Sequence, residues 1–203
     1  MRIGIEINGV LRNTIGKLEL VYQKYLIDKT EGIEDENTFK YEMILPVSSL
    51  NLRDHFKFEN DEEFFSFLYE EFPMEIFGHA GSTETMTFND FNEFYVDNRT
   101  EHDIVIVSDE IGKSKPATLF FLSKYGCQLE TIKFYSTITE NWVWENSDII
   151  ITSNPKLLEK KIEGKVLIKY ETTYNVESYS DYTIKTLEEF KELYKTLKLK
   201  QDD

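Results

Sequence analysis

Short runs of apolar residues alternate with amphipathic stretches in the second half of the chain. The runs are rich in β-branched residues, which is typical of strands buried inside a parallel sheet. Because stretches of helical spacing separate them, the order predicts an α/β fold, with a mainly parallel sheet and helices on both faces. The four runs cover residues 102–108, 131–137, 147–155 and 165–171.

The helices between these runs have recognisable ends. Pro116 suits the first turn of a helix, and Gly126 is suited to end it. A short helix is expected in "PKLLEKK", directly after the third run. Thr186 and Glu189 have the spacing of a capping pair before a last helix, whose apolar residues recur on one face.

The beginning of the chain predicts one more strand and a long helix. Residues 2–8 are rich in Ile and suit a buried strand, and Gly9 then permits a tight turn. Apolar positions follow helical spacing from Thr14, and Gly32 with the acidic residues after it is expected to end that helix. The first strand is therefore predicted to join the sheet of the second half.

A long segment then interrupts the alternation of strands and helices. A helix is predicted between a capping residue at Asn60 and a breaker at Pro73, whereas residues 78–100 are predicted to be loop-rich with a short aromatic stretch. We interpret the segment as an insertion. The predicted division is an α/β core of residues 1–12 and 101–203, with residues 13–100 as a mostly helical inserted cap.

Composition narrows the range of functions. The 203 residues have a formal net charge of −15, which disfavours binding to nucleic acids and to anionic membranes. Cys127 is the only cysteine, so an internal disulfide and a cysteine-based metal site are excluded. No stretch approaches the ~20 apolar residues of a membrane span, and no signal peptide is recognisable. We expect a soluble, cytoplasmic protein.

The ends of the predicted strands are the places where a ligand is expected. In open α/β sheets, ligands bind beyond the carboxyl ends of the strands. Those ends are Glu6 to Gly9, Ser108 to Asp109, Ser136 to Thr139, and Thr152 to Asn154. They supply carboxylates, amides and hydroxyls.

The order of these motifs resembles the haloacid dehalogenase (HAD) superfamily, and in particular its 5′(3′)-deoxyribonucleotidase-like branch, in which the cap follows the first strand. That family opens with a strand and Asp-x-Asp-Gly-Val-Leu, where this chain has "EINGVL" from Glu6 to Leu11. Its second motif is matched by Ser108. Its last motif, a strand that ends in acids, is matched by Thr152, Ser153 and Asn154. The resemblance implies a Rossmann-like core.

The resemblance also implies catalytic roles for two positions. The family's first Asp attacks phosphorus and its second Asp is the general acid and base, and these positions are Glu6 and Asn8 here. Glutamate moves the carboxylate outward by one methylene, and a displacement of about 1 Å can cost on the order of a hundredfold in rate. An amide cannot exchange a proton near neutral pH, so its cost is ~10²–10⁴-fold.

Metal and phosphate positions are implied in the same way. The family holds Mg²⁺ with its first Asp, the carbonyl of its second Asp and the acids of its last motif, which places Glu6, Thr152 and Ser153 at the metal position. Phosphate oxygens are held by a Ser or Thr and a Lys. Ser108 matches the former, and Lys113 and Lys115 are the candidates for the latter.

These changes favour a degenerate phosphatase site. We expect a protein without phosphatase activity and without a cofactor, which either binds a phosphorylated small molecule or contacts a protein partner through its cap. The alternative is an active, nucleotidase-like phosphohydrolase with Mg²⁺, in which Glu6 is the nucleophile. Asp109 or Asp148 would then have to reach the metal, but Asp148 begins its predicted strand and so lies at the wrong end of the sheet.

Two further features have two interpretations each. Trp142 and Trp144 would point the same way from an extended segment, where they either stack a base or pack against the sheet edge. The Gly-rich residues 78–83 either surround an anion with backbone N–H groups or simply join the cap to the core.

Overall fold

The computed structural model describes residues 1–30, 42–135, 140–160 and 162–199. Six strands form one sheet in the order β3-β2-β1-β4-β5-β6, and every neighbouring pair is parallel. The predicted α/β fold is therefore confirmed. The strands are β1 (Arg2–Glu6), β2 (Asp103–Ser108), β3 (Ile132–Phe134), β4 (Ile149–Thr152), β5 (Val166–Tyr170) and β6 (Tyr182–Ile184).

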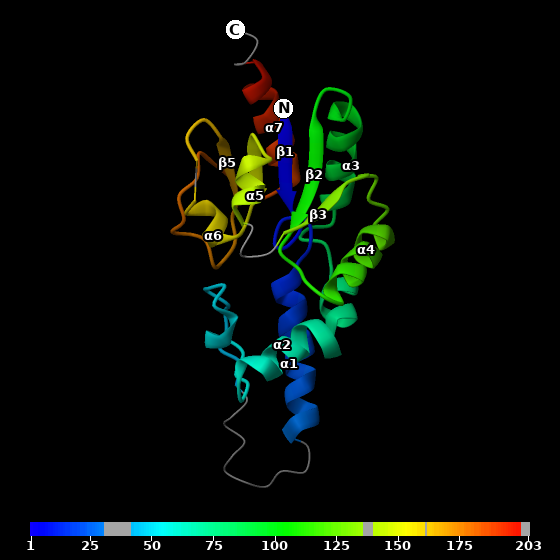
Figure 1. Cartoon of the computed structure of the whole chain (residues 1–203), viewed down its shortest axis with the longest axis vertical. Coiled ribbons are helices and arrows are strands. Elements are labelled where there is room, and N and C mark those ends of the chain that lie inside the picture. Colours follow the sequence, from blue (N-terminus) through cyan, green and yellow to red (C-terminus); the bar gives the residue numbers. More distant parts are fainter. Residues whose placement is uncertain (31–41, 136–139, 161, 200–203) are drawn as a thin grey trace.

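Helices cover both faces of this sheet (Figure 1). Side chains alternate along each strand, so neighbouring residues enter different hydrophobic clusters. Ile104 and Ile106 pack with α3 and α7, whereas Val105 and Val107 pack with α5 and α6. The helices of the described residues are α1 (Thr14–Thr30), α2 (Asp61–Ser66), α3 (Thr87–Asn98), α4 (Ser114–Lys124), α5 (Glu140–Glu145), α6 (Pro155–Leu158) and α7 (Leu187–Leu199).

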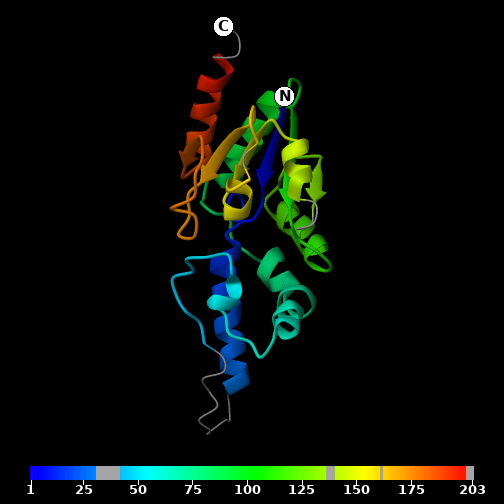
Figure 2. The ribbon, with the colours of Figure 1, turned by 60° about the vertical axis from the view of Figure 1, so that its left-hand side comes forward.

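A second body lies beyond the carboxyl ends of the strands, as Figures 1 and 2 show from two directions. We use the name cap for its residues 14–30 and 42–78. Its hydrophobic cluster is rich in aromatic residues, among which Tyr22, Phe56 and Phe67 are fully buried. Besides α1 and α2, the cap contains three short turns: η2 (Leu52–Asp54), a 3₁₀ helix, and η3 (Phe67–Glu71) and η4 (Met74–Gly78), which are π-helical.

The capping residue at Asn60 is confirmed, because its side chain accepts a hydrogen bond from the Glu63 amide at 2.8 Å. The prediction of a single α-helix from there to Pro73 is wrong. The segment is α-helical only to Ser66 and continues as the π-helical turn η3. Gly32, which was expected to end the first helix, lies outside the described residues.

The prediction that residues 78–100 are loop-rich is wrong for Thr87–Asn98, which form α3. Phe88, Phe91 and Phe94 recur at helical spacing and are buried with α7 and the sheet, while the Asn and Asp residues between them gave the stretch its loop-like composition. α3 therefore packs against the sheet and not against the aromatic cluster of the cap.

Trp142 and Trp144 are not in an extended segment, contrary to the geometry assumed from the sequence. Both lie in α5, and Trp144 is fully buried against the sheet. Packing thus accounts for Trp144. β6 was not predicted, because its three residues include only one that is fully buried. Within the described residues, no helix has the length and apolar character needed to cross a membrane.

Candidate functional site

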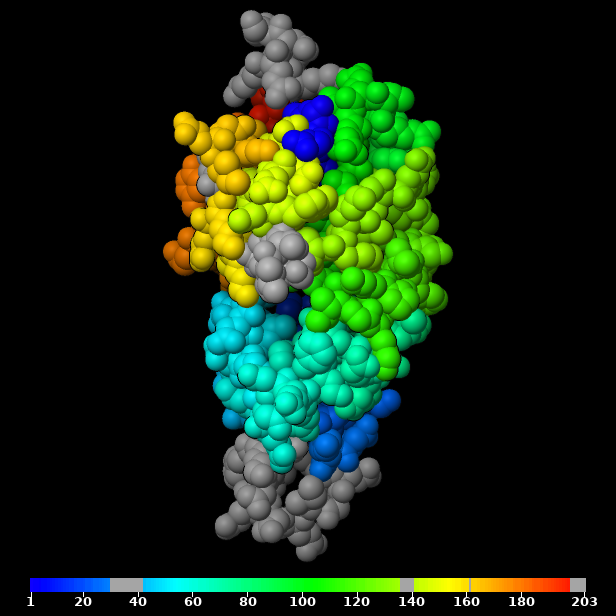
Figure 3. All heavy atoms as spheres, in the orientation of Figure 1, coloured from blue at the N-terminus to red at the C-terminus, as the bar shows by residue number. Residues whose placement is uncertain are grey.

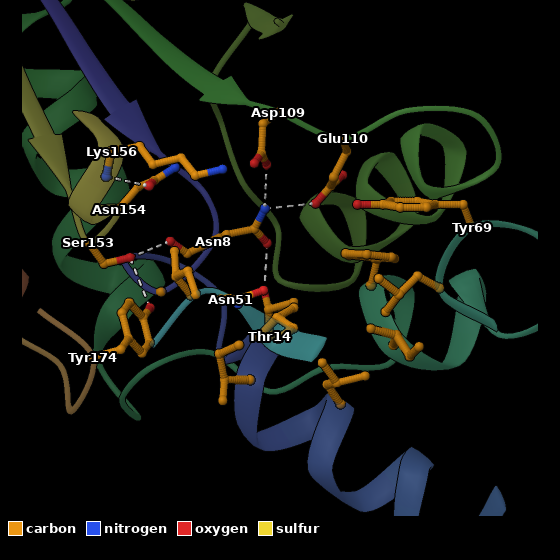
Figure 4. A pocket seen from close by; sticks show the side chains of 18 of the residues that line it. Asn8, Thr14, Asn51, Tyr69, Asp109, Glu110, Ser153, Asn154, Lys156 and Tyr174 are labelled. Atoms are coloured by element: carbon orange, nitrogen blue, oxygen red, sulfur yellow. Dashed lines mark hydrogen bonds between the residues drawn. The ribbon is translucent and has the colours of Figure 1, made fainter. Parts of the chain in front are cut away.

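A cavity of about 460 Å³ lies between the carboxyl ends of the strands and the cap, a size typical of small-molecule pockets. Its floor comes from the loops after β1, β2 and β4, and its roof comes from α1, η2, α2, η3 and η4. Figure 3 shows the hollow at this junction, and Figure 4 shows polar side chains that meet in it. Three of the four predicted strand ends are thus close together, and the fourth, Ser136 to Thr139, lies outside the described residues.

Glu6 ends β1 at the bottom of the cavity and is only 2% exposed. Its carboxyl group accepts hydrogen bonds from the Thr152 hydroxyl and, at 3.2 Å, from the Ser153 amide. Burial, followed by the charge of Asp109, raises the pKa of Glu6 to about 8, although these hydrogen bonds act in the opposite direction. Most Glu6 side chains are therefore protonated at pH 7.

The residues after β4 surround Glu6 with hydrogen-bond donors. Besides the two bonds to Glu6, the Ser153 hydroxyl donates to the backbone carbonyl of Asn8 at 2.9 Å. Tyr174 in turn donates to the Ser153 hydroxyl at 3.1 Å. Thr152 and Ser153 thus bond to both groups, the residue 6 carboxyl and the residue 8 carbonyl, that the HAD resemblance assigns to a metal.

The side-chain amide of Asn8 is used fully in hydrogen bonds (Figure 4). Its nitrogen donates to Asp109 and to Glu110, both at 3.3 Å, and its oxygen accepts from Arg12 and from Thr14, both at 2.6 Å. Only an amide can donate to two carboxylates and accept from two donors in this way. The surroundings of residue 8 therefore suit asparagine and not aspartate.

Arg12 joins this network to the cap. It is fully buried and forms an ion pair with Glu110, which is also buried. It donates to the Thr118 hydroxyl at 2.6 Å and to the carbonyl of Phe77 in η4 at 3.1 Å. Burial lowers the pKa of Arg12 to about 9, so that the guanidinium still carries its charge at pH 7.

Two more charged residues line the cavity: Asp109, which the active alternative assigns to the metal, and Lys156, to which the motifs assign no role. Asp109 follows β2, and burial raises its pKa, while bonds to its own backbone and to Asn8 and the charges of Arg12 and Lys156 lower it. Lys156 follows β4 in α6, and its side chain points toward the centre of the cavity (Figure 4). The only feature of the sequence that indicates a role for Lys156 is its position two residues after Asn154, at the end of a predicted strand.

The predicted phosphate ligands lie elsewhere. Ser108 is fully buried and accepts a hydrogen bond from the Glu110 amide at 3.2 Å, and it does not line the cavity. Lys113 forms an ion pair with Glu70 at 2.6 Å, and the Lys115 ammonium lies 5.4 Å from the centre of the Phe134 ring. Neither lysine lines the cavity.

The three residues that the resemblance assigns to a metal also lie together near the bottom of the cavity. Glu6, Thr152 and Ser153 do meet, but through hydrogen bonds to one another. Within the described ranges, no group of three or more His, Cys, Asp and Glu side chains could hold a metal ion.

Gly9 allows the loop after β1 to approach Ser153 and Tyr174 closely. Its φ is +73°, and a Cβ atom there would lie 2.3 Å from the Ser153 hydroxyl and 2.3 Å from the Tyr174 hydroxyl. Gly9→Ala is expected to lower the free energy of unfolding by at least ~2 kcal/mol, measured by urea denaturation. Gly81→Ala is the matched control, because a Cβ at Gly81 meets nothing within 4 Å. Equal losses in both variants would contradict this account.

No protein-family model and no curated protein matches the sequence. Solved structures do match. A protein from Burkholderia xenovorans LB400 described as a haloacid dehalogenase-like hydrolase has a TM-score of 0.53 at 9% identity, over 93% of this chain and 94% of that chain. The chain has the fold of the HAD-like hydrolases.

Two more HAD-fold structures support this conclusion. The HAD-hydrolase YfnB from Bacillus subtilis, solved bound to magnesium, has a TM-score of 0.53 at 12% identity, over 95% of this chain and 97% of that chain. A protein from Bacteroides vulgatus described as a beta-phosphoglucomutase has a TM-score of 0.53 at 11% identity, over 97% of this chain and 88% of that chain. At such identities the likeness concerns the fold.

Proposed function

We propose that this chain is a HAD-fold protein with a degenerate phosphatase site, which binds a small molecule with an anionic group, such as a phosphoryl group, without hydrolysing it. The cavity favours a ligand-binding role over a purely structural one, because it is enclosed by the core and the cap and contains polar groups. The single cysteine is consistent with a cytoplasmic location.

The hydrogen bonds of Thr152 and Ser153 are the observation on which the proposal rests. In the family, a divalent cation would bind the carboxylate of residue 6 and the carbonyl of residue 8. Here both oxygens accept hydrogen bonds from Thr152 or Ser153, and the motif positions Thr152, Ser153 and Asn154 hold no acid. Mg²⁺ prefers near-ideal octahedral oxygen geometry and usually needs one or two carboxylates. The residues at this position therefore do not fit the metal.

Protonation of Glu6 and the chemistry of Asn8 support the same conclusion. A carboxyl group whose pKa is about 8 is mostly neutral at pH 7, and a neutral carboxyl is a poor nucleophile. Asn8 cannot act as a general acid or base, and its amide already makes four hydrogen bonds. The nucleotidase-like alternative, with Glu6 as nucleophile, would need both the proton and these bonds to be displaced.

A phosphatase assay tests this proposal. With nucleoside monophosphates and an aryl phosphate, the protein is expected to show no Mg²⁺-dependent turnover above that of Glu6→Ala, purified in the same way to control for contaminating phosphatases. The double change Glu6→Asp with Asn8→Asp is also expected to stay inactive, because residue 8 would then be a carboxylate facing Asp109 and Glu110. Robust Mg²⁺-dependent turnover that Glu6→Ala abolishes would refute the proposal.

A further inference from the structure

We infer that the cavity takes a small molecule with an apolar body of aromatic size and a single anionic group, with the body against the cap and the anion at Lys156. The inference rests on the proposed function, since it names the class of ligand for the same cavity. It follows from the distribution of side chains in the cavity, where apolar groups lie mainly in the roof and charged and polar groups mainly on the floor.

The roof of the cavity is mostly apolar, although Thr14 and Asn51 also line it. Its apolar side chains include Ile15, Leu18, Phe64, Phe65, Leu68 and Tyr69. Arg53 and Asp61 also reach it, but they form an ion pair with each other at 3.0 Å. A sugar or another strongly hydrated body would lose hydrogen bonds to water against such a wall, whereas an apolar body gains from leaving water.

Aromatic rings form part of this wall. Tyr69 lies parallel to Phe77, with 5.9 Å between ring centres and 11° between ring planes. Phe65 contacts the same Tyr69 ring at 5.0 Å, and 46% of its surface is exposed in this structure. An exposed Phe beside a cavity is an apolar surface that a ligand can cover. The aromatic rings of the wall favour a planar ligand, which can stack on them.

Lys156 provides the positive charge on the floor. In the part of the chain that the structure describes, its ammonium has no ion-pair partner, although it lies close enough to Asp109 to lower the pKa of that carboxyl. The neighbouring Ser153 and Asn154 are polar and nearly buried. An anionic group near Lys156 would therefore complete a charge pair and meet polar neighbours.

The same residues limit the anion to one charge. Asp109 lies on the floor with Lys156, so that a second negative charge on the ligand would face a carboxylate without a cation of its own. The net charge of −15 also repels multiply charged anions at long range. A carboxylate or a singly charged phosphate ester meets this requirement, and the experiment distinguishes the two.

Ligand binding by the full-length protein tests the inference, measured by titration calorimetry. Benzoate and methyl phenyl phosphate, a diester with a single negative charge, have both parts of the predicted ligand. Acetate and dimethyl phosphate lack the body, and benzyl alcohol lacks the charge. The complete ligands are expected to bind about 10- to 100-fold more tightly than those without the ring. If benzoate and methyl phenyl phosphate differ in affinity, the one that binds more tightly identifies the anionic group.

Variants with matched controls test whether Lys156 binds the anionic group of the ligand and whether Phe65 contacts its apolar body. Lys156→Met is expected to weaken benzoate binding about 3- to 10-fold, whereas Lys115→Met, the same change outside the cavity, leaves it unchanged. Phe65→Ser is expected to weaken it by a similar factor, and Phe120→Ser is the control, because Phe120 is 43% exposed and lies outside the cavity. Both target side chains are partly exposed, so folding should be retained.

The outcomes separate this inference from the proposed function. Equal affinity for ligands with and without the ring, no effect of Lys156→Met, or no binding of any ligand at millimolar concentration would each overturn the inference. Benzoate cannot be hydrolysed, so its binding is independent of phosphatase activity. Hydrolysis of the aryl phosphate in the phosphatase assay, with retained selectivity for the ring in the binding experiment, would refute the proposed function alone.

Discussion

Replacing Arg12 by methionine is expected to lower the free energy of unfolding by about 3–5 kcal/mol. The guanidinium is fully buried, and its loss would leave the Glu110 carboxylate without its ion pair inside the protein. The change also removes the donors to Asn8 and to the Phe77 carbonyl, so that an acceptor in η4 loses a partner. The variant should therefore unfold at a much lower urea concentration.

Two controls show that the effect comes from the buried charge. Arg99→Met removes an ion pair of the same kind with Glu130, but both partners are exposed, and the expected loss is under ~1 kcal/mol. Arg12→Met combined with Glu110→Met removes both charges and should recover much of the stability, because apolar side chains can replace a buried ion pair. A double variant that is as unstable as Arg12→Met alone would contradict this explanation.

The same network predicts coupling between the cap and the cavity. Arg12 connects Asn8 and Glu110 on the floor with Phe77, which lines the roof. These contacts hold η4, and with it one side of the apolar wall, in a defined position over the strand ends. The position of the aromatic wall thus depends on a residue that does not itself line the cavity.

The strands β1, β2, β4 and β5 could be predicted from the sequence because they are short apolar runs, rich in β-branched residues, that are buried on both faces. Ile104 to Val107 and Ile149 to Ile151 are apolar at every position, and the interior of a parallel sheet removes all of these side chains from water. α3 and β6 could not be predicted in the same way. α3 has Asn and Asp residues on its exposed side, and β6 is a three-residue edge strand, so tertiary packing determines both.

The sequence predicts which residues of the candidate site stand at strand ends, but not the contacts that these residues make with distant segments. Glu6, Asn8, Thr152 and Ser153 follow strands that the sequence identifies, and they do meet. The partners of Arg12 come from four separate segments, so no local pattern signals the ion pair with Glu110. Lys113 and Lys115 stand at the start of a helix near a strand end, which makes them candidate phosphate ligands in the sequence. In the structure, Lys113 pairs with Glu70 and Lys115 lies over the Phe134 ring.

Glu6→Gln is expected to make the protein more stable than the unmodified chain at alkaline pH, and the difference should grow as the pH rises. The pKa of Glu6 is about 8 in the folded state and 4.5 in the reference state, so between these values the folded protein binds more protons than the unfolded chain. Stability that Glu6 contributes is complete below pH ~4.5 and is lost as the pH rises toward 8. Glutamine imitates the neutral carboxyl and removes this dependence.

Urea denaturation at a series of pH values measures this difference in the free energy of unfolding. The difference in the free energy of unfolding between Glu6→Gln and the unmodified protein should grow by up to about 1.4 kcal/mol per pH unit, and by on the order of 5 kcal/mol over the whole interval. The raised pKa of Asp109 contributes in the same direction to both proteins, so it largely cancels in the comparison. Glu62→Gln, an exposed change on α2, should give a curve parallel to the unmodified protein.

This measurement also decides the chemistry of the site. Parallel curves for Glu6→Gln and the unmodified protein would mean that Glu6 is ionised in the folded state at neutral pH and is available as a nucleophile. Diverging curves would mean that the Glu6 carboxyl is kept neutral by burial and by the negative charge of Asp109, despite the donors on Thr152 and Ser153. In that case the oxygen that attacks phosphorus in the HAD-like hydrolases carries a proton here, and a bound phosphate ester would remain intact.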